Sequence, residues 1–149
     1  MKQYFLQYTL LLCVASALYA KAMPMQTQEF PKKEMKKQNI QIASLAAQAM
    51  SKNLPKQIDK YTTLLSVKND ATTLVYTFAI NSDAKSDAAI QKEDHKRMQK
   101  AVTEGVCQSS QRFLQAGIDT AYVYVSVKTK KPLFRFDITK DKCTNLITK

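Results

Sequence analysis

Glycine and histidine are scarce in this chain, and tryptophan is absent. The 149 residues include two glycines and one histidine, His95. Two glycines are too few for the glycine-rich loops that cradle phosphate groups, so nucleotide-binding loops of that kind are excluded. A single histidine also removes most of the side chains that transition-metal sites and general acid–base catalysts use. The composition therefore argues against nucleotide binding, metal binding and acid–base chemistry.

Few residues remain that could support catalysis. His95 stands among charged residues (Lys92, Glu93, Lys96) in a predicted helix, where we expect an exposed surface position. No pair of carboxylates falls where two strand ends would converge, so acid–base hydrolysis has no candidates. We predict no catalytic residue, no cofactor and no metal site, and hence a protein that is not an enzyme. An enzyme of unfamiliar type is the alternative, and loss of function on mutating His95 would be its first sign.

The first 22 residues have the pattern of a secretory signal peptide. Lys2 supplies a basic start, an apolar run extends from Tyr8 to Leu18, and Ala20 and Ala22 form an A-x-A cleavage pattern. The apolar run is too short for a comfortable membrane span. We therefore predict export to the periplasm, with release to the medium as the alternative. Residues 23–37 then form a flexible basic leader, and residues 38–149 form one domain.

The predicted export determines how the cysteines are interpreted. Cys13 lies inside the signal peptide and follows Leu12, whereas a lipidated cysteine normally follows a small residue, so lipidation is not expected. Cys107 and Cys143 remain, without the C-x-x-C spacing or neighbouring histidines of a metal site. In an oxidising compartment two such cysteines are expected to pair. Closing a loop of 36 residues stabilises the fold by roughly 4 kcal/mol in the chain-entropy model.

Positive charge dominates the composition. Lysine and arginine total 23 against 12 acidic residues, a net charge of +11, which becomes +9 when Lys2 and Lys21 leave with the signal peptide. Such an excess attracts acidic proteins, anionic lipid headgroups or polymers, and nucleic acids. Nucleic acid is an improbable partner for an exported protein. The simplest alternative is a lysine-rich surface that only aids solubility.

Apolar periodicity predicts two amphipathic helices. The first covers residues 38–52, and its inward stripe consists of Ile42, Leu45, Ala46, Ala49 and Met50. Pro55 ends this helix, and residues 56–60 are expected to add one further turn.

The second predicted helix runs over residues 87–116. Ser86 or Asp87 supplies its N-terminal cap, and Gly117 stops it in left-handed geometry. Gly105 is expected to bend or split it.

Alternating apolar residues predict four strands in two hairpins. The strands cover residues 61–67, 72–80, 121–129 and 133–139, with turns at Asn69-Asp70 and at Lys130-Lys131-Pro132. The element order is then α-β-β-α-β-β. We predict an α+β fold with a four-stranded, mainly antiparallel sheet, both helices packed on one face, and one disulfide.

Aromatic residues concentrate in the predicted strands. They are Tyr76, Phe78, Tyr122, Tyr124, Phe134 and Phe136. Aromatic side chains on an open sheet between basic residues can stack nucleic-acid bases. The same residues also fit a core beneath the two helices, and we favour the core.

Several short motifs follow one another over residues 53–143. They are Leu54-Pro55 with Asp59 and Thr62-Thr63-Leu64, Val75-Tyr76-Thr77-Phe78, Val106-Cys107, Leu114 with Gly117, Tyr122 and Tyr124, Leu133-Phe134-Arg135-Phe136, and Cys143. This arrangement resembles a group of small exported bacterial proteins with the pattern L-P-x3-D-x2-T, V-C, L-x2-G, Y-x-Y and a final cysteine. Lys130-Lys131 stands where that group has a turn glycine. The resemblance implies a disulfide-linked periplasmic α+β domain and no activity, cofactor or catalytic residue.

Export, small size, basic charge and a short supply of catalytic residues together favour a binding role. The first hypothesis is a non-enzymatic periplasmic protein that binds another envelope protein, as an accessory factor, pilotin-like helper or immunity-type inhibitor. Contact through an exposed strand edge or the basic face of the long helix would suit such a role. The second hypothesis is binding of an anionic envelope lipid or polymer, and retention on anionic vesicles at moderate salt would support it.

Overall fold

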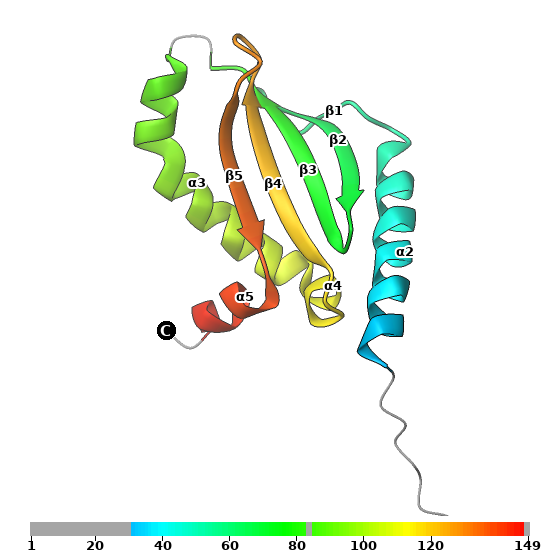
Figure 1. Cartoon of the computed structure of the whole chain (residues 1–149). Coiled ribbons are helices and arrows are strands. Elements are labelled where there is room, and N and C mark those ends of the chain that lie inside the picture. The colour runs from blue at the N-terminus through cyan, green and yellow to red at the C-terminus, as the bar shows by residue number, and fades with distance from the viewer. Residues whose placement is uncertain (1–30, 83–84, 148–149) are drawn as a thin grey trace, which may run out of the picture. The chain divides into compact units, whose positions relative to one another are not determined.

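The computed structural model describes residues 31–82 and 85–147, so the predicted signal peptide with its cleavage residues Ala20 and Ala22, and residues 23–30 of the leader, lie outside the described part. The helices are α2 (Lys32–Ser51), α3 (Asp87–Ser109), α4 (Gln111–Gln115) and α5 (Lys140–Ile147). The strands are β1 (Lys56–Gln57), β2 (Thr62–Asp70), β3 (Thr73–Ile80), β4 (Asp119–Ser126) and β5 (Pro132–Ile138). The fold is α+β, with all five strands in one sheet (Figure 1).

Strand order in the sheet follows the chain, from β1 to β5. β3 and β4 pair in parallel, while every other neighbouring pair is antiparallel. The predicted strand number of four was therefore wrong, while the sheet is mainly antiparallel as predicted, with β3–β4 as its one parallel pair. α3 and α4 connect β3 to β4, and such a long helical crossover lets the second strand start at the same end as the first. The two hairpins, β2–β3 and β4–β5, agree with the prediction.

The extra strand is the segment that was predicted to be a helical turn. Lys56 pairs with Leu64 and Gln57 pairs with Thr63. The Asp59 carboxylate accepts hydrogen bonds from the backbone N–H groups of Tyr61 (2.7 Å) and Thr62 (2.9 Å), which closes the turn between β1 and β2. This local side-chain bond is typical of aspartate in turns, and it competes with helix formation.

The β2–β3 turn lies later than predicted. β2 continues through Asn69 and Asp70, and the chain reverses at Ala71, which has a φ of 48°.

α2 and α3 pack on the same face of the sheet. Leu74 and Phe78 lie four residues apart in β3, so their side chains point to the same face. Leu74 packs against Ala43 and Ala47 of α2. Phe78 belongs to the cluster that contains Ile90 and Val106 of α3. Figure 1 shows α2 beside β2 and α3 crossing behind β5. Helix packing on one face thus agrees with the prediction.

The buried face of α2 differs from the predicted stripe. Ala43 and Ala47 are buried against the sheet, whereas Leu45 is 66% exposed and Ile42 and Met50 also reach solvent. The helix lies close to β2, with Ser51 Oγ donating a 2.8 Å hydrogen bond to the Val67 carbonyl, and that spacing leaves room for alanine side chains. α2 also begins at Lys32, within the segment predicted to be a flexible leader.

α3 ends at Ser109 and continues after Ser110 as the short helix α4, so Gly105 does not divide it. Ser86 caps α3 by accepting a 3.2 Å hydrogen bond from the Ala89 N–H. Gly117 terminates the helical segment with a φ of 82°, a left-handed conformation that suits glycine. None of the described helices is long and apolar enough to cross a membrane.

The chain forms one more helix, α5, after the second hairpin. Cys143 lies in α5 and forms a disulfide with Cys107 of α3, with 5.4 Å between the two Cα atoms. The bond therefore joins two helices rather than attaching β5 directly to α3.

Candidate functional site

A row of stacked aromatic rings crosses the centre of the helix-covered face. Tyr76 and Tyr122 stack with 4.9 Å between ring centroids, Tyr122 and Phe78 with 5.6 Å, and Phe78 and Tyr124 with 5.0 Å. The parallel register places Tyr76 opposite Tyr122 and Phe78 opposite Tyr124, so the stack follows from cross-strand pairing. We call these four residues the aromatic strip.

The aromatic strip extends from one helix to the other. At the α2 end, the Tyr76 hydroxyl donates a 3.3 Å hydrogen bond to Met50 Sδ. At the α3 end, Tyr124 contacts Phe134 and Phe136 of β5 edge-on. The His95 ring of α3 lies 5.7 Å and 5.5 Å from these two phenylalanine rings. The strip therefore occupies the space between the two helices.

Two tyrosine hydroxyls of the strip have unusual environments. Burial raises the pKa of Tyr122 and of Tyr124 to about 12, and the nearby Asp59 carboxylate adds to the shift at Tyr124. Among the described residues, neither hydroxyl has a hydrogen-bond partner. Tyr122 is half-buried, so its ring is within reach of a bound molecule. A carbonyl or carboxylate oxygen placed there would satisfy these donors.

A cleft of about 830 Å³ adjoins the strip on the α3 side. It is lined by Asp59, Lys60, Tyr61 and Thr62 before and in β2, by Ile80, Asn81 and Ser82 at the end of β3, and by Lys85, Ile90, Asp94, Arg97 and Met98. Ile90 packs in one cluster with Phe78 and Tyr124, and Met98 packs against that cluster, so these two lining residues connect the cleft to the strip. Tyr61 stands exposed at the rim, with Lys60 Nζ 5.3 Å from its ring centroid.

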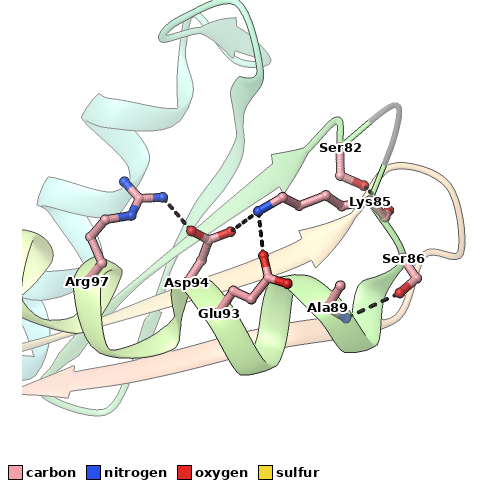
Figure 2. Close-up of polar contacts among 7 residues, drawn as sticks. All are labelled: Ser82, Lys85, Ser86, Ala89, Glu93, Asp94 and Arg97. Carbon is pink, nitrogen blue, oxygen red and sulfur yellow. Dashed lines mark hydrogen bonds and ion pairs between the residues drawn. The ribbon is translucent and has the colours of Figure 1, made fainter.

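Ion pairs form the α3 rim of this cleft (Figure 2). Lys85 Nζ lies 2.7 Å from Glu93 and 3.8 Å from Asp94, and Arg97 lies 2.7 Å from Asp94. The hydrogen bond from Arg97 and the charge of Lys85 hold the pKa of Asp94 below its usual value. Two cations and two carboxylates balance, so this rim offers neither a catalytic base nor a concentrated anion site. Exposed pairs of this kind contribute little to stability.

The structure shows where the residues lie that the sequence analysis considered for catalysis, metal binding or base stacking. His95 is exposed, and it also lies beside two aromatic rings. Within residues 31–82 and 85–147, no three metal-ligating side chains come together. All six predicted core aromatics share the helix-covered face; Tyr76 and Tyr122 are half-buried, and the other four are buried.

Sequence reasoning missed the cleft and the exposed side of α2. The apolar positions of α2 include Ala43 and Ala47 beside the predicted stripe, so they cover a wider arc than one buried face needs. That width was the available signal that part of the helix stays open for contact.

Side chains protect the outer edge of the sheet at β5. Gln91 Nε2 donates to the carbonyl oxygens of Pro132 (3.4 Å) and Leu133 (3.2 Å), and Lys142 Nζ donates to the Asp137 carbonyl. An added strand needs those acceptors. Binding through this edge, one of the routes predicted from the sequence, is therefore disfavoured.

Solved structures with the same fold include two pilotins of type II secretion systems and one protein described as secreted. The pilotin EpsS of the Vibrio vulnificus type 2 secretion system aligns with a TM-score of 0.64 and 15% identity, covering 74% of this chain and 96% of its own. The type II secretion system pilotin AspS of Vibrio cholerae aligns with a TM-score of 0.59 and 17% identity, covering 75% and 98%. A protein of Pseudomonas aeruginosa described as secreted aligns with a TM-score of 0.65 and 13% identity, covering 73% and 96%. At these identities the likeness establishes the fold.

The chain belongs to the family described as Domain of unknown function (DUF8479), whose profile matches residues 33–134. The matched segment extends from the start of α2 into β5 and so includes the aromatic strip and the cleft. No curated protein sequence matches the chain significantly.

Proposed function

We propose that this protein is an exported, non-enzymatic accessory protein that binds an amphipathic helix of another envelope protein between α2 and α3. The observation that carries the proposal is the aromatic strip, in which the hydroxyls of Tyr122 and Tyr124 are unpartnered within the described residues, together with the 830 Å³ cleft beside it. Helix-in-groove recognition uses an apolar surface of this kind, flanked by secondary structure that guides the ligand.

The side chains around the strip suit such a ligand. Met50 and Met98 supply flexible apolar contacts on α2 and α3, and methionine adapts readily to an incoming side chain. Tyr61 offers an exposed aromatic anchor at the cleft, of the residue type that often dominates binding energy. A helix rather than a strand is the favoured ligand because the β5 edge is protected by Gln91 and Lys142.

The fold neighbours support the same class of function. Two of them are pilotins of type II secretion systems, which are accessory proteins of bacterial export. A pilotin-like role would place this chain in the bacterial envelope and give it a protein partner there. The predicted signal peptide is consistent with that location, and the shortage of catalytic side chains is consistent with a binding protein.

Two exposed positions allow a test that leaves the core intact. Met50→Lys and Tyr61→Asp place charges beside the strip and in the cleft, while Val127→Asp changes a residue of matched exposure (39%, against 38% for Met50) in the β4–β5 turn. Tagged variants are crosslinked in the envelope and purified. We expect one partner protein with the wild type and with V127D, and its loss with M50K and Y61D. Equal recovery with all three variants would contradict the proposal.

A further inference from the structure

A second apolar surface lies on the side of α2 that faces away from the sheet. Met35, Ile42 and Leu45 are 44%, 39% and 66% exposed, and their spacing of seven and three residues places them along one side of the helix. The adjoining side carries the contacts with the sheet, through Ala43, Ala46 and Ala47. We call Met35, Ile42 and Leu45 the outer stripe, and they make no contribution to the core of the domain.

Positive charge gathers on the same helix. α2 contains four lysines and one glutamate, a net charge of +3, and all four lysines lie in its first two turns at positions 32, 33, 36 and 37. The acidic residue, Glu34, is paired with Lys37 at 3.1 Å. α3 differs, because its four basic residues are balanced by four acidic ones. The described residues hold 20 basic and 10 acidic side chains, a net charge of +10, and α2 supplies three of these ten charges.

We propose that α2 is a peripheral membrane-binding element that rests on an anionic phospholipid surface. The outer stripe enters the boundary between headgroups and acyl chains, and the four lysines contact lipid phosphates. Helices that lie in a membrane interface combine an apolar side with a lysine-rich polar side, as α2 does. Lys33, Lys36 and Lys37 project from the polar side of the helix, and their flexible stems let the charged groups extend toward the headgroup layer.

This surface is separate from the one that binds the proposed partner protein. Met50 contacts Tyr76 of the sheet, whereas Leu45 lies about 140° away around the helix and is 66% exposed. A membrane rather than an acidic protein is favoured because the outer stripe is convex and narrow. Interfacial helices insert one apolar side of a single helix, whereas specific protein interfaces bury a broader patch.

Vesicle sedimentation tests the proposal with matched variants. The probes are vesicles of phosphatidylcholine alone and vesicles that also contain about 30% phosphatidylglycerol, whose anionic surface attracts polybasic segments. One variant replaces the lysines of α2 by glutamine at positions 32, 33, 36 and 37. Its control replaces four exposed lysines elsewhere, Lys92, Lys96, Lys128 and Lys140. Leu45→Ser tests insertion, and Leu65→Ser, at 41% exposure in β2, is the control.

We expect the wild type to bind the anionic vesicles and not the neutral ones. The α2 lysine variant should bind at least about tenfold more weakly, and L45S several-fold more weakly at salt concentrations that screen the charges. Both controls should stay within about twofold of the wild type. Equal loss in the two lysine variants would overturn the proposal, as would an unaffected L45S or a wild type that binds neither vesicle. Loss of the partner protein with M50K and Y61D tests the proposed function and does not decide the membrane-binding proposal.

Discussion

The Tyr76 hydroxyl donates a hydrogen bond to the sulfur of Met50, 26 residues earlier in the chain. The contact joins β3 to the last turn of α2. It also distinguishes Tyr76 from Tyr122, whose ring stacks on it but whose hydroxyl has no partner among the described residues. The two neighbouring tyrosines of the strip thus have different roles. Tyr76 is hydrogen-bonded to α2, and the Tyr122 hydroxyl is open to a ligand.

Tyr122→Phe is expected to weaken partner binding without destabilising the fold. The substitution keeps the ring stack and removes an unpartnered hydroxyl from a half-buried position, so the free energy of unfolding should stay equal or rise slightly. Tyr76→Phe is the matched control, and it should lose up to about 1 kcal/mol because its hydroxyl has a partner. Urea denaturation measures both. A larger loss of stability in Y122F than in Y76F would contradict the assignment.

The alanines of α2 are expected to set its distance from the sheet. Ala43 is fully buried and Ala49 is exposed on the same helix, so Ala→Leu at the two positions is a matched pair. Ala43→Leu overpacks the contact with Leu74 and should lower the free energy of unfolding by about 1–3 kcal/mol. Ala49→Leu should leave it within about 0.5 kcal/mol. Similar values for the two variants would show that α2 is not closely packed on the sheet.

The disulfide is expected to contribute a large part of the stability. Replacing both Cys107 and Cys143 by serine opens a covalent loop of 36 residues. The chain-entropy model predicts a loss of roughly 4 kcal/mol in the free energy of unfolding. Chemical denaturation of the double variant measures this loss, and a reducing agent should lower the stability of the wild type alone. An unchanged midpoint for the reduced wild type would count against the prediction.

Stability is expected to fall in strongly alkaline solution. The pKa of Tyr122 and Tyr124 in the folded protein is about 12, against 10.0 for an unperturbed tyrosine. Because the folded protein retains protons that the unfolded chain releases, the free energy of unfolding decreases as pH rises from about 10 to about 12. Tyrosinate absorbance during a pH titration should show two groups that ionise near 12. In Tyr122→Phe one of them should disappear, and an unchanged titration curve would refute the assignment.

Local patterns in the sequence determined the hairpins, the long helix and its caps. β2–β3 and β4–β5 are joined by short turns, and Ser86 and Gly117 act on backbone groups only a few residues away. Such signals are readable because both partners lie in one stretch of chain. The class of fold and the packing of both helices on one face followed from them.

The sequence by itself therefore determined the class of fold, the aromatic character of the sheet and the scarcity of catalytic side chains. Tertiary structure decided the parallel pairing of β3 with β4, the conversion of residues 56–57 into a strand, and the side of α2 that faces the sheet. Each of these features depends on contacts between residues far apart in the chain. The periodicity of the sequence does not show which of the possible long-range pairings forms. The candidate site belongs to this second group, because Met50 meets Tyr76, and Tyr61 and Met98 line one cleft, only when two helices are placed across the same sheet.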